Sequence, residues 1–351
     1  MEKKMVRIND DYWNAAMQIH KKHPVVDAHL DLAAEIHLRY QSGEKEVIRN
    51  HYLDNLKKGG VNLVVSSVFV VSQDLPERGL KQALNQISAL LMDLKSVSDE
   101  VLLVKTKHDL ETVLASDKIG IILYMEGLDP IGAEKDLLWA FYEMGVRGAS
   151  LTWSRRNYFA EGCCNASDLK DIKGGLSLLG RETVALMEEI PMFLDISHLN
   201  DEGFKELASL TSKPFIATHS NARSIHMNYR NLTDEQILVL AKQNGIMGLN
   251  AYKDIVGADP SLDSVPKMCD HLEHVIRLAG DSHVGFGFDL CDSYFMAVSG
   301  HNIEKPKEDC ITSHAQIPEI TAELLRRGHS EETIAKIIGG NFLTYFYEFL
   351  P

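Results

Sequence analysis

The sequence predicts an α/β protein of the (β/α)8, TIM-type barrel class, and three observations predict it. A short buried-strand pattern recurs eight times along the 351 residues, amphipathic helical stretches separate the strands, and polar side chains repeatedly follow the strand ends. A chain that is 45% hydrophobic can bury the core of such a barrel. No Pro-, Gly- or Ser-rich linker divides the chain, so we expect one domain over residues 1–351.

Eight segments rich in apolar and β-branched residues carry the strand pattern. They are residues 25–30, 61–69, 119–125, 146–151, 191–194, 214–217, 245–249 and 284–287. The helical stretch at 201–210 follows Asn200, a good N-cap, and Thr233 with Gln236 three residues later fits a capping box. We also expect an N-terminal helix at about residues 9–22 and a C-terminal helical segment at about residues 331–350.

The charge balance excludes several classes of partner. The formal net charge is −14, from 36 basic and 50 acidic side chains, which would repel a nucleic-acid backbone and an anionic membrane surface. The longest near-apolar run, residues 61–71, is shorter than the roughly 20 residues of a transmembrane helix. The N-terminal residues lack an apolar signal-peptide core and the five cysteines are scattered, so we expect reduced thiols and a cytoplasmic location.

Side chains that bind metals end several of the predicted strands. His29 and Asp31 end the first strand, and Glu126 ends the third. His198 follows the fifth strand and His219 ends the sixth. Taken singly, each histidine is more often a hydrogen-bonded interior residue than a ligand, and Glu126 could be a loop carboxylate. Because the carboxyl ends of barrel strands converge on one mouth, where barrel enzymes have their active sites, the shared position favours a metal site.

Three histidines and two carboxylates at one mouth suit zinc or a similar divalent ion. Glu126 is placed to bridge two ions. His29 and Asp31 could hold one of them. His198 and His219 could hold the other. Two ions about 3.5–4 Å apart would acidify a bridging water to hydroxide and polarise a carbonyl group. The chain has no G-x-S-x-G motif and no cysteine beside a plausible base, so a serine or cysteine nucleophile is not expected.

Four more residues near strand ends complete the predicted site. Asp289 ends the eighth strand, where a carboxylate over the ions could shuttle protons or simply cap the strand. Arg230, in a loop after the sixth strand, could grip a substrate carboxylate in a bidentate fork or remain a solvated charge. Trp153 and Tyr252 follow the fourth and seventh strands, so they are candidate substrate contacts at the same mouth.

Two other features carry no predicted site. His271 and His274 share a helical face but lack the H-E-x-x-H spacing, so we expect them on the helix surface. Cys163 and Cys164 are adjacent, which rules out an ordinary disulfide between them, and they lack partners at zinc-ribbon spacing.

The motifs that carry these residues resemble those of the membrane (renal) dipeptidase family of the amidohydrolase superfamily. They follow the family's order over nearly the whole chain: VVDAHLDL, MEG, GVRGASLTWSRRN, LDISHLND, ATHSNARSIHMNYRNLTDE, HVGFGFD and GGNFLTYF. The resemblance implies a (β/α)8 barrel, two zinc ions bridged by Glu126, and hydrolysis of dipeptides, including those with a C-terminal D-residue. It also implies that Arg230 receives the substrate carboxylate, that Asp289 is the acid/base group, and that the protein forms a homodimer.

Two residues depart from the family pattern. The renal enzyme has a substrate-contacting histidine where this chain has Trp153, whose indole N–H can donate one hydrogen bond but cannot bind metal. Cys291 stands where the family commonly has a second acidic residue. Two alternatives therefore stay open beside the dipeptidase: an amidohydrolase of another small amide or lactone, and a metal-free barrel with a binding role.

Overall fold

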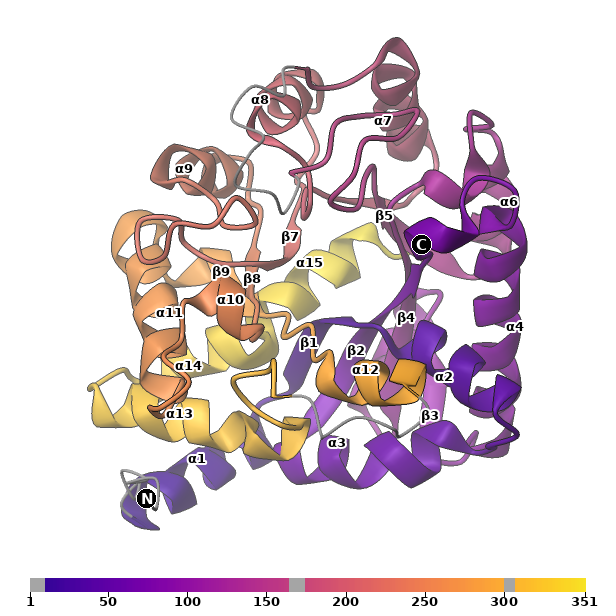
Figure 1. Ribbon diagram of the computed structural model, residues 1–351. Coiled ribbons are helices and arrows are strands. Elements are labelled where there is room, and N and C mark those ends of the chain that lie inside the picture. The colour runs from indigo at the N-terminus through magenta and orange to yellow at the C-terminus, as the bar shows by residue number, and fades with distance from the viewer. Residues whose placement is uncertain (1–9, 164–173, 300–306) are drawn as a thin grey trace.

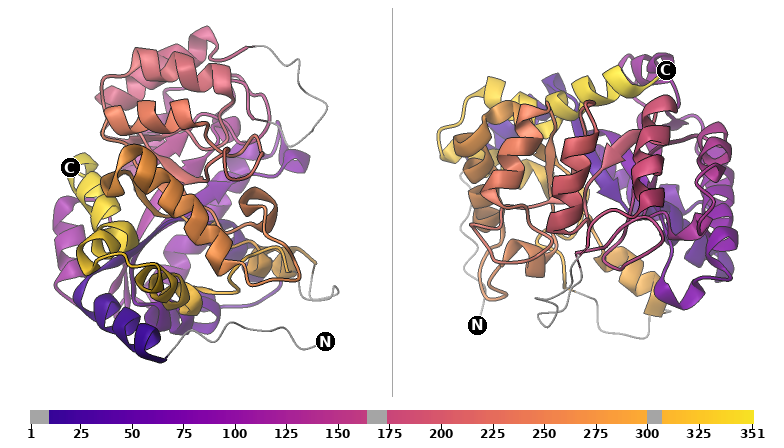
Figure 2. Two further views of the ribbon diagram at one scale, coloured as in Figure 1. Left: turned by 90° about the vertical axis from the view of Figure 1, so that its left-hand side faces the viewer. Right: turned by 90° about the horizontal axis from the view of Figure 1, so that it is seen from above.

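The computed structural model describes residues 10–163, 174–299 and 307–351, and it shows an α/β fold with curled parallel sheets (Figures 1 and 2). One sheet has the strand order β1-β2-β4-β5-β6 with β3 paired to β4, and the other has the order β7-β8-β9. The strand pairs of both sheets are parallel. The strands are β1 (Val25–Leu30), β2 (Val61–Phe69), β3 (Val101–Leu103), β4 (Ile119–Glu126), β5 (Val146–Ser150), β6 (Phe193–Asp195), β7 (Ala217–Ser220), β8 (Met247–Leu249) and β9 (Val284–Phe286).

Helices connect the strands and surround them in the view of Figure 1. Asn200 and Thr233 cap the helices that follow them, and Thr233 forms the predicted capping box with Gln236. The helices are α1 (Asp10–Lys22), α2 (Leu32–Gln41), α3 (Leu53–Gly59), α4 (Gly79–Ser96), α5 (Lys107–Leu114), α6 (Leu137–Glu143), α7 (Leu178–Glu189), α8 (Asp201–Leu210), α9 (Asp234–Lys242), α10 (Lys253–Val256), α11 (Val265–Ala279), α12 (Asp292–Ser299), α13 (Ile317–Arg326), α14 (Glu331–Ala335) and α15 (Asn341–Phe349), with π-helical turns at Ile48–Tyr52 and Lys336–Gly340. No helix among the described residues is both long and apolar enough to cross a membrane.

The predicted strands are all present, with one displacement and one addition. β1 and β2 begin and end at the predicted residues, and the other six predicted segments overlap β4 to β9. The segment predicted at 214–217 is shifted, because Ile216 makes only an isolated bridge and the strand itself begins at Ala217. β3, which pairs only with β4 outside the main strand order, was not predicted.

The predicted closed barrel is not confirmed, because the strands form two separate sheets. At one junction Ile216 accepts a hydrogen bond from the Ile196 N–H at 2.8 Å and donates to the Leu194 carbonyl at 3.0 Å. At the other junction the Asp289 N–H donates to the His29 carbonyl at 3.1 Å. β6 and β9 have three residues each, so these junctions carry isolated bonds and no continuous ladder.

Alternating side chains divide the core into an inner and an outer part. On β4, Ile122 and Tyr124 belong to the inner cluster of buried residues, whereas Ile121 and Leu123 belong to the outer cluster that includes the surrounding helices. α15 contributes Phe346 and its neighbours to the inner cluster. This helix therefore packs against the inward side chains of the strands. The carboxyl ends of the strands are left for polar side chains.

Candidate metal centre

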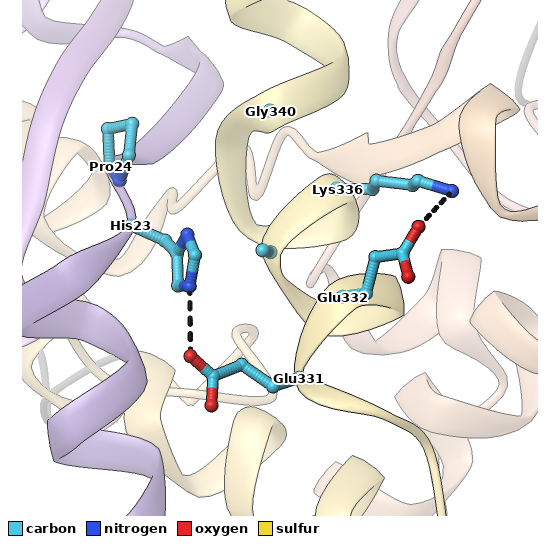
Figure 3. A pocket seen from close by; sticks show the side chains of 7 residues that line it. His23, Pro24, Glu331, Glu332, Lys336 and Gly340 are labelled. Carbon is cyan, nitrogen blue, oxygen red and sulfur yellow. Dashed lines mark hydrogen bonds and ion pairs between the residues drawn. The ribbon is translucent and has the colours of Figure 1, made fainter.

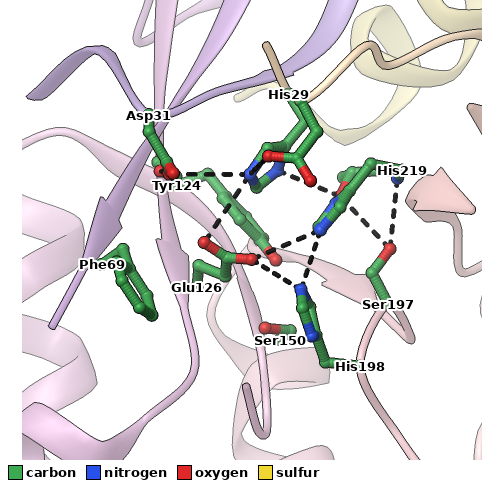
Figure 4. Close-up of polar contacts among 12 residues, drawn as sticks. His29, Asp31, Phe69, Tyr124, Glu126, Ser150, Ser197, His198 and His219 are labelled. Carbon is green, nitrogen blue, oxygen red and sulfur yellow. Dashed lines mark hydrogen bonds and ion pairs between the residues drawn. The ribbon is translucent and has the colours of Figure 1, made fainter. Parts of the chain in front are cut away.

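A buried polar cluster lies at the carboxyl ends of the strands (Figure 4). On β4, Glu126 continues the inward row that includes Tyr124, so its carboxylate points to the inside. His29 comes from the second half of β1, where a register shift interrupts the alternation and allows the ring to face the same side. His198 follows β6 and His219 lies on β7.

Three imidazole rings surround the carboxylate of Glu126. Its Oε1 lies 2.8 Å from Nε2 of His198 and 3.3 Å from Nε2 of His219. Its Oε2 lies 3.6 Å from Nε2 of His29. The Nε2 atoms of His198 and His219 are 2.9 Å apart, and the rings of His29 and His219 are 3.7 Å apart between centroids. All three rings thus turn the same nitrogen toward one carboxylate.

Two further carboxylates close the cluster beside His29. Asp31 and Asp289 each place an oxygen 3.8 Å from Nε2 of His29. The Ser67 hydroxyl donates to Asp31, and the Asn250 amide donates to Oδ2 of Asp289 at 3.0 Å. The structure therefore brings the five predicted ligands and Asp289 together in one place.

The donor set fits divalent cations. Nε2 of His29 is buried and has no hydrogen-bond partner among the described residues, which is costly unless another group takes up this nitrogen. Imidazole nitrogens and carboxylate oxygens are the ligands that zinc prefers beside thiolates. Two groups offer ligand atoms that lie within 4.8 Å of one another: His29, Glu126 and His219; and Asp31, Asp289 and Cys291.

The protonation properties of the cluster also favour a cation. Burial lowers the pKa values of His198 and His219 well below the ordinary range, and nearby positive charges lower them further, so both rings are neutral. Burial raises the pKa of Glu126 to about 7 although His29 opposes the rise, and burial likewise raises the pKa of Asp289. Burial by itself would lower the pKa of His29, but the surrounding carboxylates raise it well above its usual value. The positive charge near these buried carboxylates is therefore too small to offset their burial. A bound divalent ion would supply the missing positive charge.

Two residues of the cluster have strained backbones. His198 has φ 69° and Asp289 has φ 55°, both in the left-handed region that residues other than glycine rarely adopt. The His198 carbonyl accepts a hydrogen bond from the Cys163 N–H at 2.8 Å, and the Asp289 N–H is bonded to the His29 carbonyl at 3.1 Å. Such strain costs on the order of 1–3 kcal/mol per residue and concentrates at functional sites. This backbone conformation directs the side chains of His198 and Asp289 into the cluster.

Trp153 forms an aromatic wall beside the cluster. Its ring lies 5.6 Å from that of His198 and 5.1 Å from that of Phe69. The guanidinium of Arg155 lies 5.2 Å from the Trp153 ring and donates to Asp129 at 2.9 Å, which holds the wall from behind.

Arg230 and Tyr252, the other predicted substrate contacts, reach the cluster in different ways. Arg230 is buried and donates from Nη2 to the His219 carbonyl at 2.9 Å. Tyr252 is linked through its backbone, because its N–H donates to Oδ1 of Asn250 at 2.6 Å and Asn250 donates to Asp289. Arg230 is thus next to a predicted ligand, whereas Tyr252 is two hydrogen bonds away from Asp289.

Several supporting residues were not predicted. Ser154 Oγ lies 2.7 Å from Nδ1 of His198, and Ser67 donates to Asp31. Strand alternation could have found Ser67 and Phe69, which lie on the inward row of β2. Ser154 lies in an irregular loop, where the sequence gives no signal of direction.

One of the two histidines expected on a helix surface is not there. His271 is fully buried, accepts a hydrogen bond from the Ala222 N–H at 3.1 Å and contacts the Val256 carbonyl at 3.0 Å. The expectation was wrong because the loop after β7 and the end of α10 pack over that face of α11. His274 is partly buried and pairs with Asp234 at 2.8 Å. Sγ of Cys163 lies 3.7 Å from Oγ of Ser154, and Cys164 lies outside the described residues.

Among the described residues, hollows also lie outside the cluster. One of about 530 Å³ lies between the end of α1 and α14, and none of its lining residues is a predicted site residue (Figure 3). Another, of about 610 Å³, is lined by Arg155 and Asp129 behind the Trp153 wall. Neither hollow brings a second set of metal ligands together.

Histidines and carboxylates gathered at the carboxyl ends of parallel strands are typical of metal-dependent hydrolases. The family comparison agrees with this class: the model of the membrane dipeptidase family, peptidase family M19, matches residues 13–348. The chain belongs to this family and is a dipeptidase of the metallopeptidase type.

Relatives and solved structures support the assignment. The chain is similar to Dipeptidase verJ of Clonostachys rogersoniana, with 26% identity over 95% of this chain and 86% of that protein. It is also similar to Dipeptidase 3 of Rattus norvegicus, with 27% identity over 94% of this chain and 66% of the rat protein. The structure resembles that of a metallopeptidase from Rhodobacter sphaeroides bound to a phosphinate mimic of the dipeptide L-Ala-D-Ala, with TM-score 0.79, 26% identity, and coverage of 93% of this chain and 98% of the other.

Proposed function

We propose that this chain hydrolyses dipeptides with two zinc ions held at the cluster around Glu126. His29 and Asp31 would hold one ion. His198 and His219 would hold the other, and Glu126 would bridge the two. The observation that carries the proposal is the convergence of three buried Nε2 atoms on one carboxylate, with the Nε2 of His29 left without a hydrogen bond. When bound, the ions would activate a bridging water as nucleophile and polarise the scissile carbonyl.

Arg230 would bind the free carboxylate of the substrate. Its side chain is buried, and among the described residues no carboxylate forms an ion pair with it. An unpaired buried guanidinium beside the cluster is suited to a carboxylate that arrives with the substrate. This contact would hold the C-terminal end of a dipeptide beside the metal ligand His219.

Asp289 would move the proton during hydrolysis. Burial raises its pKa, which favours the protonated form of the side chain. Its Oδ2 is held by Asn250 at 3.0 Å and its Oδ1 faces His29, which places the carboxyl group at the edge of the cluster. From there it can protonate the departing amine.

The substrates would include L-Xaa-D-Xaa dipeptides. The Rhodobacter sphaeroides metallopeptidase was solved with a mimic of L-Ala-D-Ala, and that resemblance supports the same stereochemistry here. A site that grips the free carboxylate through Arg230 leaves the configuration of the C-terminal residue weakly constrained.

We also propose that the two sheets close into a single (β/α)8 barrel domain. The Ile216 bridge and the bond from Asp289 to His29 support this closure. A homodimer and a cytoplasmic location remain predictions of the sequence.

The test is a panel of L,L and L,D dipeptides with zinc-loaded protein, wild type and Arg230→Ala. We expect Arg230→Ala to lower kcat/KM for dipeptides by about 100-fold, as loss of a buried charge pair would. Arg181→Ala, which removes a surface pair with Glu206, is the matched control and should leave kcat/KM unchanged. No turnover of any dipeptide by zinc-loaded wild type would refute the proposal.

A second candidate function comes from Trp153, whose ring lies against His198. This wall would suit another small amide or a lactone without a free carboxylate. A carboxylate-free substrate that outperforms every dipeptide, together with a harmless Arg230→Ala, would favour this candidate. Metal analysis that finds less than one ion per chain would instead favour a metal-free barrel with a binding role.

A further inference from the structure

One hydroxyl beneath the cluster contacts two of its histidines. Oγ1 of Thr218 lies 2.8 Å from Nδ1 of His219 and 3.5 Å from Nδ1 of His29. It also donates to Oδ2 of Asp195 at 2.6 Å, and Ser197 Oγ lies 3.4 Å away. All five residues are buried. Thr218 therefore touches the ring nitrogens that face away from Glu126.

The direction of these hydrogen bonds follows from Asp195. Its carboxylate can only accept, and it accepts from the Tyr124 hydroxyl, from the Ser197 and Thr218 N–H groups at 2.9 Å each, and from the Thr218 hydroxyl. Thr218 has one proton and gives it to Asp195, so only its lone pairs face the histidines. A lone pair bonds to a ring nitrogen that carries hydrogen, which assigns the proton of a neutral His219 to Nδ1 and leaves Nε2 free.

The backbone around Thr218 is fixed by two glycines. A Cβ at Gly248 would lie 2.0 Å from the Thr218 carbonyl oxygen, and a Cβ at Gly287 would lie 1.7 Å from it. A register shift between Ala217 and Ser220 lets the consecutive residues Thr218 and His219 both reach the inside of the sheet. The close packing of β7, β8 and the residue after β9 thus fixes the position of the Thr218 hydroxyl under the cluster.

We propose that Thr218 is a positioning residue whose hydroxyl, oriented by Asp195, holds His219 in the tautomer that presents Nε2 to the metal. The inference rests on the proposed metal centre and extends it to the residues that prepare the ligands. A neutral histidine binds a cation only through an unprotonated nitrogen, so a fixed tautomer removes one cost of binding.

The first experiment measures zinc affinity by competition with a chromophoric chelator. Thr218→Val keeps the β-branched shape and removes the hydroxyl, and we expect the Kd for zinc to rise by about 10- to 100-fold. Thr218→Ser keeps the hydroxyl and should stay within about threefold of wild type. The matched control is Thr321→Val, because Thr321 is also buried and lies 2.8 Å from a histidine, His20, between α1 and α13. It should leave the zinc Kd unchanged.

Equal zinc affinity of wild type and Thr218→Val would overturn the inference, as would an equal loss in Thr218→Ser and Thr218→Val. A second measurement needs no variant at Thr218. In metal-free, 15N-histidine-labelled protein, with the His219 signals assigned by His219→Gln, we expect the ring proton on Nδ1. A proton on Nε2 would overturn the inference even if Thr218→Val fails to fold. Wild type that binds no zinc but keeps the Nδ1 proton would refute the proposed metal centre and leave the role of Thr218 intact.

Discussion

Replacing Asp195 by asparagine tests whether the buried network beneath the cluster serves stability alone or also metal binding. Oδ1 of Asp195 accepts two backbone N–H groups at 2.9 Å, and Oδ2 accepts the hydroxyls of Tyr124 and Thr218. In Asp195→Asn the amide oxygen can keep the two backbone bonds. The amide NH2 then faces the two hydroxyls, which must turn their protons away. The proton of Thr218 turns toward Nδ1 of His219 and favours the tautomer that is wrong for metal binding.

The size of the effect follows from the bonds that change. Two hydrogen bonds to a charged acceptor are lost, each of about 1.5–3 kcal/mol, and two neutral ones of about 1 kcal/mol replace them. We therefore expect the free energy of unfolding of the metal-free protein to fall by roughly 1–4 kcal/mol, measured from the urea midpoint and slope. The zinc Kd should also rise by about 10- to 100-fold.

Asp93→Asn is the matched control for this change. Asp93 is also fully buried, and it accepts the Val47 and Ile48 N–H groups at 3.0 and 2.8 Å and the Tyr40 hydroxyl at 2.8 Å. It joins α4 to α2 and to the turn at Val47 and Ile48, so its asparagine variant should lose similar stability and keep the wild-type zinc Kd. The reasoning is refuted if Asp195→Asn unfolds within about 0.5 kcal/mol of wild type, or if Asp93→Asn weakens zinc binding as much.

Two further perturbations test the geometry and the electrostatics of the cluster. Gly287→Ala would place a Cβ 1.7 Å from the Thr218 carbonyl oxygen, so we expect a loss of about 3 kcal/mol or more in the free energy of unfolding, and a loss below 1 kcal/mol would contradict this close approach. In metal-free protein burial raises the pKa of Glu126 from 4.5 to about 7. A raised folded-state pKa contributes stability that is complete below the unfolded value and is lost as pH rises through about 7. At about 1.4 kcal/mol per pKa unit, the stability of wild type relative to Glu126→Gln should fall by roughly 3 kcal/mol between about pH 4.5 and pH 8. Urea denaturation at several pH values checks this, and a constant difference would refute it. His29, whose pKa is also raised, changes stability in the same direction.

Much of the cluster could be predicted because its geometry follows from topology. Parallel strands in a curled sheet end at the same side, so ligand-type residues at strand ends meet without any knowledge of distances. His29, Glu126, His198 and His219 are such residues, and the structure places them together. The sequence pattern could not predict whether the sheet closes. It locates a short strand such as β6 but does not tell whether that strand pairs continuously with the next one.

The sequence by itself determined the strands, the helix caps and the set of polar residues at the strand ends, because each depends on local pattern or on the order of the elements. Only the tertiary structure decided what lies beneath them. Thr218 and Asp195 act through a strand irregularity and through the close approach of Gly248 and Gly287, and neither leaves a periodic signal in the sequence. The burial of His271 beneath Ala222 and Val256 was decided in the same way. The physical reason is that hydrogen-bond direction and burial depend on contacts between segments far apart in the chain.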